Sequence, residues 1–126
     1  MSLLVLVVDD SMLIRHAVCR FLEERGYAVQ SATNGEDALA AIQRTQPQLV
    51  ITDIEMPRMG GNELITHLKS RPDTAQIPIV VLTSCTKKGA ADQRANFAIH
   101  KDIDINDQLA KALSSVLKTR CATAGF

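Results

Sequence analysis

Three aspartates stand at the ends of apolar runs, where a carboxylate is both held by the fold and open to reagents. The run Leu49–Thr52 leads into Asp53, and the run Leu3–Val8 leads into Asp9 and Asp10. Short unbroken apolar runs are typical of strands that are buried on both faces of a parallel sheet. Because the carboxyl ends of parallel strands share one edge, we expect these carboxylates to converge in the crevice where open α/β sheets bind ligands.

Carboxylates crowded at one edge repel one another, and a hard divalent cation relieves that repulsion. Mg²⁺ suits such a site because it binds a few carboxylate oxygens and keeps waters, which leaves room for a phosphoryl group. An aspartate beside it can accept phosphate as a mixed anhydride. Phosphoryl transfer then needs mainly positioning and charge neutralisation. Thr83, at the end of the apolar run Ile79–Leu82, and Lys101 are candidates to supply them.

The segments between these runs carry helical periodicity, so strands and helices alternate along the chain. Spacings of three and four predict a helix capped by Ser11 that buries Ile14, Ala17, Val18, Phe21 and Leu22, and one opening at Asn34-Gly35 that buries Ala38, Leu39 and Ile42. They also predict a helix capped by Asn62 that buries Leu64, Ile65 and Leu68, and a last one capped by Asn106 that buries Leu109, Ala112, Leu113, Val116 and Leu117.

Two shorter strands and a weak helix complete the pattern. Tyr27–Ala32 and Phe97–His100 predict strands, whereas the alanine-rich, polar segment 87–96 predicts a fourth helix that is short or irregular. Right-handed crossovers then give an α/β fold, a five-stranded parallel sheet with helices on both faces. We expect a single domain over 1–126 with its core over about 3–118 and a tail that frays from about Thr119.

Composition excludes several other classes of protein. The 14 basic and 14 acidic side chains cancel, so no general field attracts nucleic acid or an anionic membrane. Cys19, Cys85 and Cys121 are widely spaced and odd in number, which favours free thiols in a reducing cytoplasm over disulfides or a zinc site. The longest apolar run has six residues, far short of the roughly 20 that span a bilayer.

Four segments together resemble the receiver domain of two-component response regulators, in register along nearly the whole chain. They are Val7–Ser11, Thr52–Gly61, Val81–Ser84 and Lys101. The resemblance implies a flavodoxin-like fold with strand order 2-1-3-4-5. It also implies a regulatory protein that catalyses only its own phosphorylation and dephosphorylation, and so is not an enzyme in the usual sense.

The resemblance assigns a role to each matching residue. It makes Asp53 the phosphoacceptor, Asp10 a direct Mg²⁺ ligand and Asp9 a ligand through water, with the backbone carbonyl of Glu55 completing the protein's share of the metal shell. Thr83 and Lys101 then bind phosphoryl oxygens. A sensor histidine kinase or phosphotransfer protein donates the phosphate, and an unidentified downstream protein responds. We expect a monomer or a weak dimer.

The sequence departs from the family pattern on the output side. Asp102 stands where the family has a proline, Ala98 stands where it often has an aromatic residue, and the stretch from Thr83 to Lys101 is about one helical turn short. These departures leave open a second hypothesis, a pseudo-receiver that docks partners without using phosphorylation. A third hypothesis, a small enzyme with an aspartyl-phosphate intermediate, lacks a cap domain and substrate-pocket elements.

Overall fold

A computed structural model of the chain describes residues 3–54, 56, 59–83, 97–100 and 105–123, and of these only the backbone at 83, 97, 100 and 116–123. Its strands are β1 (Leu4–Val8), β2 (Ala28–Ala32), β3 (Leu49–Asp53), β4 (Ile79–Thr83) and β5 (Phe97–His100). They form one sheet in the order β2-β1-β3-β4-β5, with every neighbouring pair parallel. The predicted parallel sheet and its strand order are therefore confirmed.

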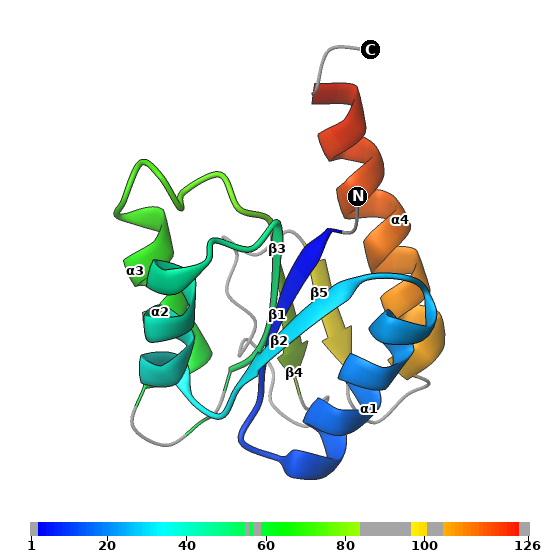
Figure 1. Ribbon diagram of the computed structural model, residues 1–126, viewed down its shortest axis with the longest axis horizontal. Helices are drawn as coiled ribbons and strands as arrows, with labels where there is room; N and C mark the ends of the chain where they lie inside the picture. Colours follow the sequence, from blue (N-terminus) through cyan, green and yellow to red (C-terminus); the bar gives the residue numbers. More distant parts are fainter. Residues whose placement is uncertain (1–2, 55, 57–58, 84–96, 101–104, 124–126) are drawn as a thin grey trace.

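The helices cover both faces of this sheet, as predicted. Among the described residues they are α1 (Met12–Glu24), α2 (Gly35–Arg44), α3 (Gly61–Lys69) and α4 (Ile105–Thr123). Figure 1 shows α2 and α3 together on one side of the sheet and α1 and α4 on the other. The weak helix predicted over 87–96 lies outside the described residues.

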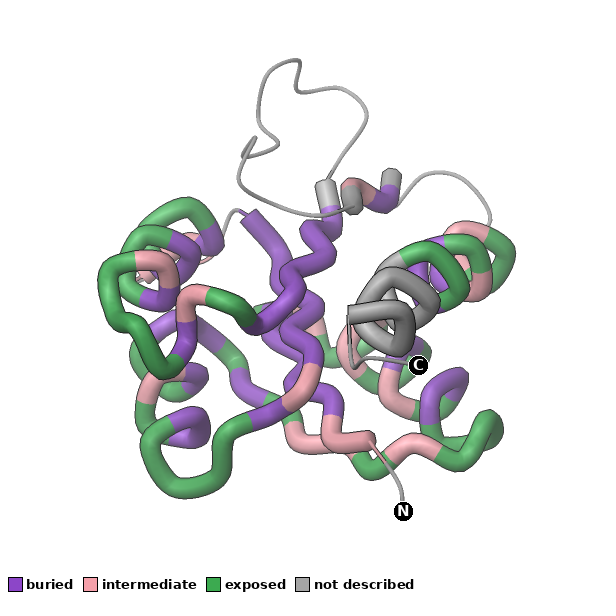
Figure 2. The backbone as a smooth tube through the Cα atoms, turned by 90° about the horizontal axis from the view of Figure 1, so that it is seen from above, coloured by how far each residue is buried: buried purple, intermediate pink, exposed green. Residues whose placement is uncertain are grey.

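Strand alternation divides the core into two apolar clusters. Val5 and Val7 of β1 pack with residues of α1 and α4, whereas Leu6 and Val8 pack with residues of α2 and α3. Because both faces of each central strand are covered, its residues are almost all apolar, which explains the unbroken runs in the sequence. In Figure 2 the strands at the centre are buried and the outward helix faces are exposed.

The starts of the helices and their buried faces agree with the predictions in part. Ser11 and Asn34 are the N-caps of α1 and α2, and their side chains accept hydrogen bonds from the N–H groups of Ile14 and Asp37. Ala17 is exposed, contrary to prediction. The buried stripe of α1 centres on Val18, Phe21 and Leu22, so Ala17 falls on its flank.

The predicted caps of the other two helices, Asn62 and Asn106, are wrong, because both helices start earlier in the chain. The N-cap of α3 is Gly60, without a side-chain hydrogen bond, because Gly61 already lies in the helix and its N–H donates to the Ile54 carbonyl at 2.8 Å. Helix α4 starts at Ile105, which packs against the sheet, so Asn106 lies in the first turn. The helix continues to Thr123, past the point where we expected fraying, and its last turns project beyond the sheet (Figure 1).

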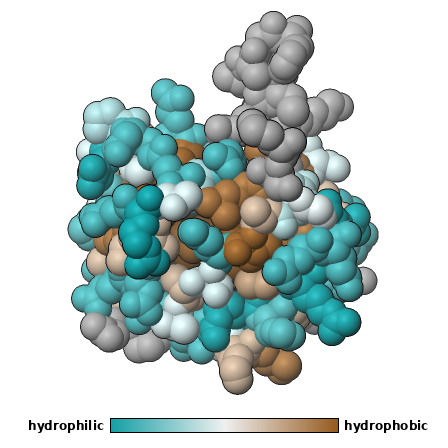
Figure 3. Space-filling model, viewed as in Figure 1, coloured by the Kyte–Doolittle hydropathy of each residue, from teal (hydrophilic) through white to brown (hydrophobic). Residues whose placement is uncertain are grey.

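The exterior is mixed, with few large apolar side chains. Among the described residues, the exposed large hydrophobic side chains are Met12 and Leu13, which are 69% and 79% exposed. In Figure 3, apolar atoms lie at the lower edge of the molecule, where α1 begins in Figure 1. In the part of the chain that the structure describes, no helix has the length and hydropathy needed to cross a membrane.

Candidate functional site

The predicted acidic cluster forms at the carboxyl edge of the sheet. Strands β1 and β3 are parallel neighbours, and Val8 is aligned with Thr52 in their register. The next residue of each chain segment is an aspartate, Asp9 after β1 and Asp53 at the end of β3, so the pairing sets these two side by side. Asp10 follows at once, where the chain leaves the sheet and turns into α1.

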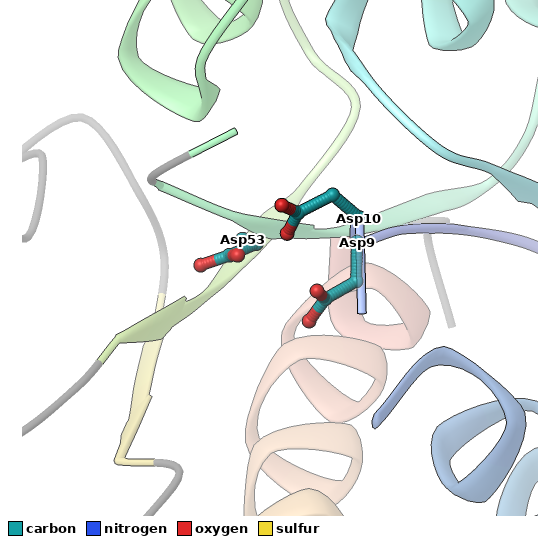
Figure 4. A group of neighbouring side chains, drawn as sticks. All are labelled: Asp9, Asp10 and Asp53. Atoms are coloured by element: carbon teal, nitrogen blue, oxygen red, sulfur yellow. The ribbon is translucent and has the colours of Figure 1, made fainter. Parts of the chain in front are cut away.

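The three carboxylates are close but differ in exposure. One oxygen from each of Asp9, Asp10 and Asp53 can be chosen so that all three lie within 4.8 Å of one another. Asp9 is 0% and Asp53 6% exposed, whereas Asp10 is open to solvent. Figure 4 shows the three side chains at the strand ends. The prediction that these aspartates meet is therefore confirmed.

Asp9 is fixed by bonds from three directions. Its N–H donates to the carbonyl of Ala32 on β2 at 3.1 Å, and its Oδ1 accepts from the Ser11 N–H at 2.8 Å. Its carbonyl oxygen accepts from Nη1 of Arg15, one turn into α1, also at 2.8 Å. The last of these contacts was not expected from the sequence, where Arg15 carries no motif.

The backbone after Asp53 is folded tightly against α3. A Cβ added to Gly61 would collide with the Asp53 carbonyl oxygen and lie 2.9 Å from the Ile54 Cα, so only glycine allows this approach. A Cβ at Gly60 would lie 2.8 Å from the Ile54 carbonyl oxygen. The sequence analysis treated this glycine pair as part of a loop, although two adjacent glycines after a candidate site are a signal of close backbone packing.

A second tight contact ties α2 to the same loop. The Gly35 N–H donates to the Met59 carbonyl at 3.0 Å, and a Cβ at Gly35 would lie 2.5 Å from Met59 Cγ. Helices α2 and α3 therefore both contact the chain close to Asp53, α3 at Ile54 and α2 at Met59.

The acidic cluster fits a small divalent cation. Oxygens on opposite sides of an octahedral Mg²⁺ lie about 4.2 Å apart, twice the metal–oxygen distance of about 2.1 Å. The 4.8 Å limit on the separation of the three oxygens is close to this value, so small side-chain rotations bring them to ligand distance. All three ligand atoms are carboxylate oxygens, which Mg²⁺ prefers.

The other predicted site residues are described only in part. Thr83 is the last residue of β4. Asp53 is aligned with Leu82 in the register of β3 and β4, so the backbone of Thr83 lies at the same edge of the sheet as the aspartates. Its side chain, and the whole of Glu55, Lys101 and Asp102, lie outside the described residues. Ala98 on β5 is half-buried and packs against the cluster on the α2 and α3 side of the sheet.

Cavities found elsewhere do not include the aspartates. One of about 320 Å³ lies between α2 and α3, and one of about 420 Å³ lies between α1 and β2. Cys19 lines the second cavity, and its burial, with a smaller contribution from Glu23, raises the pKa of its thiol above the ordinary value of 9.0. Among the described residues, Asp9, Asp10 and Asp53 form the one His, Cys, Asp or Glu cluster spaced for a metal ion.

Comparison with known proteins agrees with this geometry. The chain matches the response regulator receiver domain family over residues 5–114. It is 32% identical to the response regulator MprA of Mycobacterium bovis over 124 residues, 95% of this chain and 53% of MprA. It is 38% identical to a gliding motility regulatory protein of Myxococcus xanthus over 80 residues, 64% of this chain and 10% of that protein.

A solved structure shows the same fold at comparable identity. The chemotaxis response regulator CheY4 of Vibrio cholerae has a TM-score of 0.83 and 32% identity, covering 92% of this chain and 99% of CheY4. The chain spans about half the length of the MprA relatives that it matches. With the family match, the fold and the acidic edge in agreement, the chain belongs to the response regulator receiver domain family of two-component signalling.

Proposed function

We propose that this receiver domain accepts a phosphoryl group on Asp53 from the phosphohistidine of a sensor kinase or phosphotransfer protein, with Mg²⁺ held by the acidic cluster. The observation that carries the proposal is the approach of three carboxylates to within 4.8 Å. Asp53 is the one that ends a central strand. It is 6% exposed, so the fold fixes its position at the edge of the sheet.

The reaction assigns a distinct task to each residue. A carboxylate oxygen of Asp53 attacks the phosphorus of the donor, an O–P bond forms, and the N–P bond breaks with its electron pair returning to the imidazole. Asp9, Asp10, Asp53 and the backbone carbonyl of Glu55 would hold Mg²⁺, which would neutralise charge on the phosphoryl oxygens. By their match to the family, Thr83 and Lys101 bind phosphoryl oxygens, and a water molecule later hydrolyses the acyl phosphate.

The surface beside the cluster supports contact with a protein donor. Met12 and Leu13 are the large apolar side chains that the described surface exposes most, and they follow Asp10 by two and three residues. Exposed apolar residues next to a reactive group are typical of a surface that a partner covers. A kinase or phosphotransfer protein bound here would bring its phosphohistidine to Asp53.

Phosphorylation by a small donor tests the proposal directly. We expect acetyl phosphate with Mg²⁺ to add the mass of one phosphoryl group to the intact protein, and EDTA to prevent the addition. Asp53→Asn should abolish it. Asp73→Asn should not, because Asp73 is exposed and paired with Arg71 at 3.4 Å, away from the cluster. Phosphorylation that persists in Asp53→Asn would contradict the assignment.

The alternative of a docking module rests on Asp102 and Ala98, which stand where the family usually has a proline and often has an aromatic residue. Beryllofluoride, a stable mimic of the phosphoryl group, separates the two functions. A phosphorylation switch predicts amide NMR shifts that extend from Asp53 into β5 and α4, for example to Ile99 and Leu109. A docking module predicts shifts limited to the residues around Asp53.

The enzyme hypothesis predicts a different result. A phosphatase with an aspartyl-phosphate intermediate would turn over a phosphoester such as p-nitrophenyl phosphate many times per molecule. Receiver domains are signalling proteins, and we expect this turnover to be negligible. Sustained turnover that is lost in Asp53→Asn would favour the enzyme.

A further inference from the structure

Arg15 reaches back from α1 to the main chain of the acidic cluster. Its Nη1 lies 2.8 Å from the carbonyl oxygen of Asp9, and the side chain is partly buried between α1 and β2, where it lines a cavity of about 420 Å³. The guanidinium therefore binds the backbone of the site. A charged donor makes a stronger hydrogen bond than a neutral one, so this contact restrains the carbonyl well.

The carbonyl that Arg15 binds belongs to the peptide group between Asp9 and Asp10. This group is planar, so holding its oxygen also sets the direction in which the chain enters Asp10. Asp10 depends on this restraint more than its neighbours do. Asp9 and Asp53 are buried in the sheet edge, whereas the Asp10 side chain is exposed, so packing restrains it less.

Two other bonds of Asp9 act on different parts of the residue. The Asp9 N–H is bonded to Ala32 on β2, and Oδ1 is bonded to the N–H of Ser11. These bonds fix the strand end and the Asp9 side chain, but neither of them holds the Asp9 carbonyl. The bond from Arg15 acts on the carbonyl itself, and through it on the peptide group that leads into Asp10.

We propose that Arg15 is a positioning residue of the cation site: it orients the Asp9–Asp10 peptide so that the exposed Asp10 carboxylate stands ready to bind Mg²⁺. The inference rests on the proposed function in that Asp9, Asp10 and Asp53 bind the metal. It predicts that loss of Arg15 weakens Mg²⁺ binding, whereas simple electrostatics predicts that loss of Arg15 strengthens it. A positive charge near the site should weaken cation binding, so loss of the charge alone would tighten it.

Three variants separate position from charge. Arg15→Met removes the donor and the charge but keeps a long apolar stem, and the adjoining cavity gives that stem room. Arg15→Lys keeps the charge and one donor without the planar fork. Arg20→Met is the matched control, since Arg20 lies on the same helix, is 72% exposed and pairs with Glu24 at 3.6 Å.

Binding of Mg²⁺ by titration calorimetry is the first measurement. We expect Arg15→Met to bind about tenfold more weakly than the wild type, as is typical when a group that orients metal ligands is removed. Arg15→Lys should fall between the two, and Arg20→Met should match the wild type. The second measurement needs no metal: NMR relaxation of the Asp10 amide, whose N–H belongs to the peptide group that Arg15 binds, should show larger motion in Arg15→Met and no change in Arg20→Met.

The possible failures are distinct. Equal or tighter Mg²⁺ binding by Arg15→Met overturns the positioning role, even if that variant unfolds at a lower temperature. Failure of the wild type itself to bind Mg²⁺ overturns the proposed metal site, and the inference about Arg15 with it. If Arg15→Met does not fold, Arg15→Lys decides alone, because a charge effect predicts wild-type affinity and a positioning effect predicts a loss.

Discussion

Removing one charge from the acidic cluster should make the metal-free protein more stable. The substitution is Asp53→Asn, which keeps the shape of the side chain and removes its negative charge. The native fold holds Asp53 beside Asp9 with both nearly buried, whereas the unfolded chain separates them and exposes them to water. The repulsion therefore acts mainly on the native state, and its loss favours folding.

The magnitude follows from the geometry. Two unit charges 4.8 Å apart repel by about 3.5 kcal/mol at an effective dielectric constant of about 20. Weaker hydrogen bonding by the neutral amide offsets about 1 kcal/mol of this gain. We therefore expect the free energy of unfolding to rise by about 1–3 kcal/mol. For a chain of 126 residues, this corresponds to a rise in melting temperature of about 4–11 °C.

Thermal unfolding followed by circular dichroism, in EDTA and again with Mg²⁺ at constant ionic strength, measures this effect. In EDTA the variant should melt above the wild type. Added Mg²⁺ should stabilise the wild type by about 1.4 kcal/mol when the Mg²⁺ concentration is tenfold above Kd. The difference in melting temperature between Asp53→Asn and the wild type should therefore become smaller. Glu24→Gln, which removes an exposed carboxylate of a surface pair, should change stability by less than about 1 kcal/mol.

The reasoning fails under either of two results. If Asp53→Asn is no more stable than the wild type in EDTA, the three carboxylates do not repel one another as their distances imply. If the difference between the two proteins is the same with and without Mg²⁺, the cation does not bind at the cluster.

Four further predictions concern single residues. Gly61→Ala places a Cβ on the Asp53 carbonyl oxygen, so it should lower the free energy of unfolding by about 1–3 kcal/mol and weaken Mg²⁺ binding, as measured by thermal melts with and without the metal. Ser11→Ala removes the N-cap bond to the Ile14 N–H and should lower stability by about 1 kcal/mol in urea unfolding. In a variant with the other two cysteines replaced by alanine, iodoacetamide should react with Cys19 slowly at pH 8 and faster only above pH 9.0, because burial raises the pKa of its thiol. Since that pKa is raised in the native state, the stabilisation that the neutral thiol contributes should be complete below pH 9.0 and decrease as the pH rises further.

The sequence alone predicted the helices and strands that the structure describes, and the three aspartates of the acidic site. Unbroken runs such as Leu49–Thr52 reflect burial on both faces of a strand, and the spacing of Val18, Phe21 and Leu22 reflects one buried face of a helix. Both signals are local, because hydrophobic burial acts on each segment through its own periodicity. The aspartates were predictable for the same reason, since each directly follows such a run.

The tertiary structure alone decided how the site is held. That Asp9 and Asp53 are neighbours depends on β1 pairing with β3, and that pairing is a property of the whole sheet. The start of α3 at Gly61 and the contact of Arg15 with the Asp9 carbonyl depend on backbone atoms brought close by packing. A main-chain carbonyl or N–H is nearly the same in every residue, so the sequence does not identify its partner, even where a glycine pair signals close backbone packing, and the partner becomes visible only when the chain is folded.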